Sequence, residues 1–242
     1  MRWSFFVLFF LMLSCGKNNE NCPFPSKIIV KNKNKDVSDT ISLVFMGDVM
    51  GHTPVLKSFY NKEQKTYNFD YLFEKVLPLI KKSDYAIANL ELTLAGRPFT
   101  GYPRFSAPVE LAMSCKDAGI QILATANNHS CDRGKKGIIK TINKLDKIGV
   151  RHFGTYINNK AREEFNLLIL EKNTIKIGLL NYTYGTNGLP IPEGVCVNLI
   201  DTSQMKLDIE KSKKERLDKL VVLLHWGAEY QLKPSNEQRK LA

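Results

Sequence analysis

The chain has 242 residues, 43% hydrophobic and 24% charged, enough for one large domain of ordinary globular composition. Its formal net charge is +11, and residues 1–40 contain six Lys/Arg against three Asp/Glu, leaving 29 against 21 in the rest. This balance permits an anionic partner. The absence of zinc-finger spacing, an RNA-binding aromatic motif or an Arg cluster argues against nucleic acid.

The first fifteen residues, "MRWSFFVLFFLMLSC", predict an export signal. The apolar run from Phe5 to Leu13 is too short to span a bilayer. Ser14-Cys15 directly follows it, which resembles a bacterial lipoprotein signal with Cys15 as the lipid acceptor. The alternative is an ordinary secretory signal with an incidental cysteine. Residues 16–40 are polar and lack periodicity, so we predict a flexible tether there.

From residue 41 onward, strand-like and helix-like segments alternate. Strands are expected over 41–48, 84–91, 120–129 and 219–227, the first and last of them buried, and a hairpin over 165–182 turned at Lys172-Asn173. Helices are expected over 69–83, 107–119, 134–149 and 201–218, with Asp201 as an N-cap, and another begins near Pro234. The βαβα order predicts a single α/β domain over 41–242 with a largely buried sheet. The remaining cysteines have no spacing that defines a disulfide framework.

Polar side chains stand where four of these strands end: Asp48, Asn89 with Glu91, Asn128 with His129, and His225. Each has an ordinary structural explanation, such as a turn cap or a hydrogen-bonded core histidine. Ligands of α/β sheets gather at the carboxyl ends of strands, so four such positions together indicate one shared site. Carboxylate, amide and imidazole donors suit Mn, Fe or Zn.

Five stretches carry a family resemblance: "GDVMGH", "NLELTLAGRPFTGYPRFSAP", "TANNHSCDRGKKGI", "YTYGTNGLPIP" and "LLHWGAEYQLKPSNEQRKLA". They resemble the poly-γ-glutamate capsule biosynthesis (CapA-type) family of the calcineurin-like metallophosphoesterase superfamily. The resemblance implies a β-sandwich flanked by helices, with two divalent metal ions bound on loops after the strands. It further implies a phosphoester hydrolase of capsule or surface-polymer synthesis, with a capsule-synthesis complex as a possible partner. Together with the signal at the N-terminus, this predicts an exported, membrane-anchored protein. The alternative is a non-catalytic accessory subunit that binds polymer.

The resemblance also assigns roles to single residues. Asp48, Asn128 and His225 would be metal ligands, and His129 the catalytic histidine, held by Asp132 or another acid. Met50 stands where the superfamily usually has a ligand histidine, so His52 is a substitute candidate. "NLE" replaces the usual Gly-Asp, so the bridging acid would be Glu91, or else Asn89.

The stretch "YTYGTNG" is either a plain turn or a substrate-side loop, and its length and aromatic content favour the loop, with Tyr182, Tyr184 and Asn187 as contacts. Beyond the stretch that matches "LLHWGAEYQLKPSNEQRKLA", the superfamily continues into a strand and a Gly-His-His-type motif. The chain does not contain this motif. We therefore expect a C-terminally truncated domain that holds at most one metal firmly.

Overall fold

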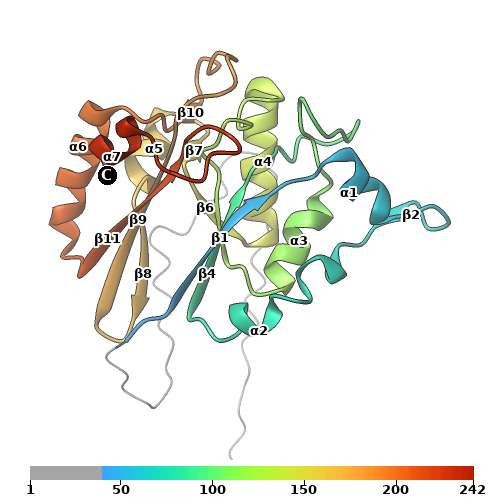
Figure 1. The fold of residues 1–242 in the computed structure, drawn as a ribbon, viewed down its shortest axis with the longest axis horizontal. Helices are drawn as coiled ribbons and strands as arrows, with labels where there is room; N and C mark the ends of the chain where they lie inside the picture. Colours follow the sequence, from blue (N-terminus) through green and yellow to red (C-terminus); the bar gives the residue numbers. More distant parts are fainter. Residues whose placement is uncertain (1–39) are drawn as a thin grey trace, which may run out of the picture.

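The computed structural model describes residues 40–242 and shows a mixed α/β domain built on two main sheets (Figure 1). The first sheet has the order β1-β4-β5-β6, all parallel: β1 Leu43–Val49, β4 Tyr85–Leu90, β5 Ile122–Ala124 and β6 Arg151–Phe153. The second has the order β11-β9-β8: β8 Leu168–Lys172, β9 Ile175–Thr183 and β11 Lys219–His225. Strand β11 is parallel to β9, whereas β8 is antiparallel to it.

The remaining elements surround these sheets. Two short pairs are β2 Tyr60–Asn61 with β3 Thr66–Tyr67, and β7 Thr155–Tyr156 with β10 Cys196–Val197. The helices are α1 Thr53–Ser58, α2 Leu77–Ile80, α3 Val109–Asp117, α4 Gly134–Ile148, α5 Asn159–Phe165, α6 Thr202–Ser212 and α7 Asn236–Leu241, with 3₁₀ turns at Asp70–Phe73 and Lys213–Glu215.

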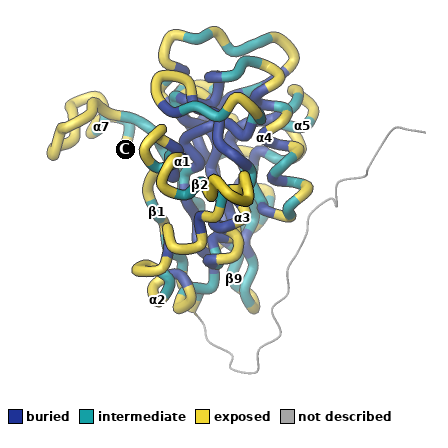
Figure 2. The backbone as a smooth tube through the Cα atoms, turned by 90° about the vertical axis from the view of Figure 1, so that its right-hand side faces the viewer, coloured by how far each residue is buried: buried dark blue, intermediate teal, exposed yellow. Residues whose placement is uncertain are grey.

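Successive side chains along a strand point to opposite faces of its sheet. One face of each main sheet packs against the other sheet, and the opposite face packs against helices. Ile87 of β4 and Leu179 of β9 belong to one cluster that lies between the two sheets. The neighbouring residue Ala88 faces the other way, onto Leu111 of α3. Leu180 faces away from the first sheet, onto Met205 of α6. The order of layers is therefore helix, sheet, sheet, helix, which confirms the expected β-sandwich flanked by helices. In Figure 2 the buried backbone is concentrated in the centre of these layers, and α7 is exposed.

Several local predictions are confirmed. Asp201 caps α6, because its side chain accepts hydrogen bonds from the backbone amides of Ser203 and Gln204. The β8–β9 hairpin turns where expected, with Asn173 at φ +55°. Helix α7 starts after Pro234, with Ser235 as its N-cap. The helix predicted over 69–83 is wrong as a continuous element, since it is split into the 3₁₀ turn and α2.

The physical reason for that split is Pro78, in the first turn of α2. Its ring would clash with the carbonyl four residues earlier, so a helix cannot run through it but can begin there. The strands over 41–48 and 219–227 also differ from expectation, because β1 and β11 are edge strands among the described residues and are only partly buried. An edge strand lacks a neighbour on one side, so solvent reaches it.

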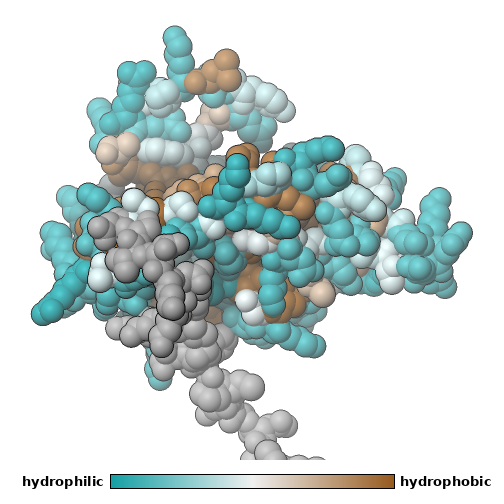
Figure 3. Space-filling view, turned by 90° about the horizontal axis from the view of Figure 1, so that it is seen from below, coloured by the Kyte–Doolittle hydropathy of each residue, from teal (hydrophilic) through white to brown (hydrophobic). Residues whose placement is uncertain are grey.

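The end of the molecule where the parallel strands begin carries exposed apolar side chains (Figure 3). Tyr71, Leu72, Val76 and Leu79 are exposed there, on the segment that leads into and includes α2. Ser42, just before β1, hydrogen-bonds Asp84, just after this segment.

The predicted lipid acceptor Cys15, with the signal and nearly all of the tether, lies outside the described residues. No helix within 40–242 is long and apolar enough to cross a membrane.

Candidate metal centre

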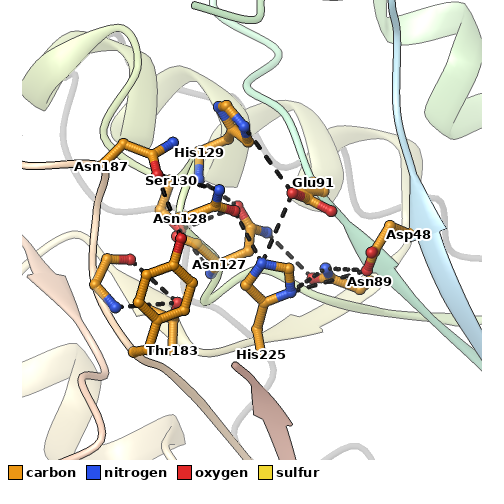
Figure 4. A network of polar contacts seen from close by, with 12 residues as sticks. Asp48, Asn89, Glu91, Asn127, Asn128, His129, Ser130, Thr183, Asn187 and His225 are labelled. Atoms are coloured by element: carbon orange, nitrogen blue, oxygen red, sulfur yellow. Dashed lines mark hydrogen bonds and ion pairs between the residues drawn. The ribbon is translucent and has the colours of Figure 1, made fainter. Parts of the chain in front are cut away.

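The polar strand-end residues meet at one edge of the sandwich (Figure 4). Asp48 lies near the end of β1, Glu91 directly follows β4, and His225 is the last residue of β11. Asn128 and His129 follow β5. The site therefore combines residues from both sheets, and β11 brings His225 across to the acids of the first sheet.

Asp48, Glu91 and His225 form a donor group in which one ligand atom of each lies within 4.8 Å of the others. The Nδ1 atom of His225 is 3.9 Å from Asp48 Oδ1, and its Nε2 atom is 3.7 Å from Glu91 Oε1. Only one nitrogen of His225 can face a shared cation, so the relevant limit is the 4.8 Å spacing of one atom from each residue. That spacing leaves a central point at most about 2.8 Å from each donor atom, within a small side-chain shift of the bond lengths of divalent cations. The residues therefore fit a divalent metal ion.

Asn128 adds an oxygen to this group. Its Oδ1 atom lies 2.9 Å from His225 Nε2, while its Nδ2 atom donates to Asn187 Oδ1 at 3.2 Å. Asn89 is arranged differently. Its Nδ2 atom donates to Asp48 Oδ1 at 2.7 Å and lies 3.3 Å from His225 Nδ1. An NH₂ group cannot bind a metal, so in this orientation Asn89 holds Asp48 in place, and Glu91 is the acid of this strand end that joins the donor group.

Asn127, to which the sequence analysis assigned no role, links the end of β4 to the loop after β5 through hydrogen bonds. It is fully buried, and its Nδ2 atom donates to the Leu90 carbonyl at 2.8 Å and to Asn89 Oδ1 at 3.1 Å. Its Oδ1 atom accepts from the backbone N–H of His129 at 3.1 Å. The sequence signal for this role was that two asparagines, Asn127 and Asn128, precede His129, whereas a turn can form with one.

His129 lies behind the donor group, paired with Asp132. The two side chains are buried, and Nδ1 of His129 is 2.8 Å from Oδ2 of Asp132. The same carboxylate oxygen accepts from the backbone N–H of Phe105 at 2.6 Å, and the Phe105 ring packs edge-on against His129. Nε2 of His129 faces Glu91, 4.0 Å from Oε1 (Figure 4). Asp132 thus fixes the imidazole with one nitrogen directed at the site.

The electrostatics of the donor group favour a cation. Burial, followed by the nearby charge of Asp48, raises the pKa of Glu91 to about 8. Burial and the proximity of His129 lower the pKa of His225, against the opposing charge of Asp48. The first shift shows that a buried carboxylate lacks a counter-charge, and the second keeps the imidazole neutral, which is the form that binds metal.

Two predicted site residues lie elsewhere. His52 precedes α1, is exposed, and packs its ring edge-on against Phe105, outside the donor group. The prediction that Tyr182 belongs to a substrate loop is wrong, because it lies within β9, is fully buried, and donates its hydroxyl to Asp208 at 2.8 Å. Tyr184 does lie at the site, 52% exposed, with its ring stacked at 6.1 Å on His225.

The two-sheet sandwich and its strand-end donor group define an α/β sandwich domain with a candidate metal centre. Residues 42–242 match the profile of the bacterial capsule synthesis protein PGA_cap, and the chain belongs to that family. It is 29% identical over 216 residues to the "Capsule biosynthesis protein CapA" of Bacillus anthracis, covering 85% of this chain and 51% of that protein. It is 26% identical to the "PGA biosynthesis protein CapA" of Bacillus subtilis (strain 168), covering 84% and 53%.

The chain thus spans about half the length of the curated relatives it matches. Among solved structures, a phosphatase from Mycoplasma pneumoniae aligns over 78% of this chain and 56% of the phosphatase chain, at 18% identity and a TM-score of 0.45.

Within the described residues, Cys115, Cys131 and Cys196 are free thiols.

Proposed function

We propose that this protein is an exported, lipid-anchored, metal-dependent phosphoester hydrolase that acts in the synthesis of an anionic surface polymer such as poly-γ-glutamate. The observation that carries the hydrolase proposal is the placing of His129 beside the donor group of Asp48, Glu91 and His225. A metal-binding group alone would serve a binding protein equally well. A buried histidine fixed by a carboxylate and directed at that group is the arrangement of a proton donor.

In this proposal Asp48, Glu91, His225 and Asn128 hold the metal, which in such sites neutralises phosphoryl charge and supplies Lewis acidity. Asn89 keeps Asp48 directed inward through its 2.7 Å hydrogen bond. With both ring nitrogens protonated, His129 would donate Nδ1–H to Asp132 and give the Nε2 proton to the leaving oxygen of the ester as water attacks phosphorus. Burial of His129 and Glu91 excludes water from that side, so substrate enters from the side of the exposed Asp48.

The proposed place of action follows from the family and the first residues of the chain. Family membership supports a role in capsule synthesis. Ser14-Cys15 after a short apolar run supports a lipid anchor in the cell envelope, and the net charge of +11 is compatible with an anionic polymer. If Cys15 is the anchor, Cys15→Ala releases the protein from the membrane fraction. Retention there at the original processed size would disprove the anchor.

A second function is supported by one specific observation. The described residues provide one three-residue His/Cys/Asp/Glu donor group, and His52 is turned away from it. A two-metal mechanism needs more ligands than this group supplies. The alternative is therefore a non-catalytic subunit that uses a single cation to bind the polymer, within a capsule-synthesis complex.

Measuring bound Mn²⁺ and the hydrolysis of bis(p-nitrophenyl) phosphate by the purified full-length protein distinguishes the two. For a hydrolase, Asp48→Asn loses metal and turnover together, while His129→Ala keeps metal and loses about 10²- to 10⁴-fold in rate. Leu207→Ala, on the exposed side of α6, serves as the control and keeps both. Metal binding without turnover in the wild-type protein would favour the accessory role. Normal metal content in Asp48→Asn would disprove the site.

A further inference from the structure

The loop of residues 184–188, which follows β9, contacts the metal centre through its side chains rather than only bordering it (Figure 4). Asn187 Oδ1 accepts a hydrogen bond from Asn128 Nδ2 at 3.2 Å. The Tyr184 hydroxyl donates to the same Asn187 oxygen at 3.4 Å, and its ring stacks on His225. The loop therefore contacts Asn128 and His225, two of the residues that would hold the metal.

These contacts bear on which end of the Asn128 amide faces the site. The two ends of an amide have nearly the same shape, but only the oxygen can bind a cation. In the structure Asn128 directs Oδ1 at His225 Nε2, 2.9 Å away, and Nδ2 at Asn187. A rotation of the amide by 180° would place the Asn128 oxygen against the Asn187 oxygen and the NH₂ group against the metal centre. The acceptor on Asn187 opposes that rotation.

The backbone at Asn187 determines which substitution can test its side chain without straining the loop. Asn187 has φ +52° and is followed by Gly188 at φ +73°. Glycine adopts this left-handed region without strain, whereas a residue with a Cβ incurs roughly 1 kcal/mol there. On backbone grounds alone glycine would suit position 187. The asparagine present there uses its carbonyl oxygen to hold Asn128.

We propose that Asn187 is a positioning residue, which fixes the amide of Asn128 with its oxygen toward the metal, and that Tyr184 supports it. This inference rests on the proposed metal centre. Groups that orient metal ligands through hydrogen bonds typically contribute about 10- to 100-fold to metal affinity. Loss of the Asn187 oxygen should weaken metal binding by that factor without weakening the fold, because glycine relaxes the backbone at this position.

The test is the Mn²⁺ affinity of the full-length protein by titration calorimetry, together with the urea midpoint of the metal-free protein. Asn187→Gly should bind Mn²⁺ about 10- to 100-fold more weakly, with an unchanged or higher urea midpoint. Asn187→Asp keeps an acceptor that cannot rotate into a donor, and should retain at least wild-type affinity. Asn173→Gly is the matched control: it also removes an asparagine side chain at positive φ, but in the β8–β9 turn.

Each outcome decides a separate point. Wild-type affinity in Asn187→Gly, or weakened binding in Asn187→Asp, would overturn the positioning role while leaving the metal centre intact. Equal losses of affinity in Asn187→Gly and Asn173→Gly would show a general effect of loop mobility, and would also overturn it. If the wild-type protein binds no Mn²⁺, the metal centre itself fails, and with it the proposed function.

Discussion

Removal of the Tyr182 hydroxyl tests directly whether this residue belongs to the core or to the substrate site. The hydroxyl donates to Asp208 Oδ2 at 2.8 Å, and Arg162 donates to the same oxygen at 2.6 Å. Gln204 donates to the other carboxylate oxygen at 3.0 Å. Since the Asp208 side chain is only 3% exposed, water cannot replace a lost donor. The cluster lies between β9 and α6, so its loss should weaken the second sheet.

Tyr182→Phe keeps the ring and deletes one hydrogen bond to a buried carboxylate. Hydrogen bonds to charged groups contribute about 1.5–3 kcal/mol, so we expect a loss of about 2 kcal/mol in the free energy of unfolding at pH 7. With a urea m value of about 2 kcal/mol/M, the unfolding midpoint should fall by about 1 M at unchanged m. Tyr184→Phe is the control, because its exposed hydroxyl makes only the 3.4 Å contact, and its midpoint should change little.

The effect should depend on pH in a defined direction. Burial alone would raise the pKa of Asp208, but hydrogen bonds from Arg162 and Tyr182 outweigh it and hold the pKa below its ordinary value. A lowered carboxyl pKa stabilises the fold above the unfolded-state value of about 3.9, and this stabilisation is lost as the pH falls through the folded-state value. The difference between wild type and Tyr182→Phe should therefore shrink below about pH 4. An unchanged urea midpoint together with lost turnover would refute the core assignment and restore Tyr182 as a substrate contact.

Three further predictions concern the proton donor, the core and acid stability. Asp132→Asn should retain Mn²⁺ but lower kcat by about 10²-fold, because His129 loses the acceptor that orients it; unchanged kcat would count against its role. Ile87→Ala, between the two sheets, should cost about 2–5 kcal/mol in urea unfolding, whereas Leu79→Ala, at a site 63% exposed, should cost little; equal effects would contradict the sandwich core. The wild-type protein should lose stability in thermal melts below about pH 4, since Asp84, like Asp208, has a lowered pKa: burial would raise it, but Lys172 and Ser42 outweigh burial. A flat stability profile down to pH 2 would contradict these shifts.

Local signals in the sequence determined much of the fold and most of the donor residues. Strand patterns followed by Asp48, Glu91 and His225 indicated a shared site without knowledge of distances, because parallel strands end at a common edge. The family resemblance implied that Asp132 or another acid holds His129, and the structure pairs His129 with Asp132. Capping of α6 by Asp201 depends on a few adjacent residues, so it too could be read from the sequence.

Only the tertiary structure decided which side chains enter the site and which atoms of them face it. Tyr182 and Asn181 are neighbours in β9 and must point to opposite faces, but only the packing of α6 determines that Tyr182 is the one beside Asp208. The amide of Asn89 could direct oxygen or nitrogen at Asp48, and its orientation depends on Asn127, which comes from another strand end. His52 is close to Asp48 in sequence, yet its ring packs on Phe105 instead of entering the donor group. Such choices depend on contacts between segments far apart in the chain, and no local pattern encodes them.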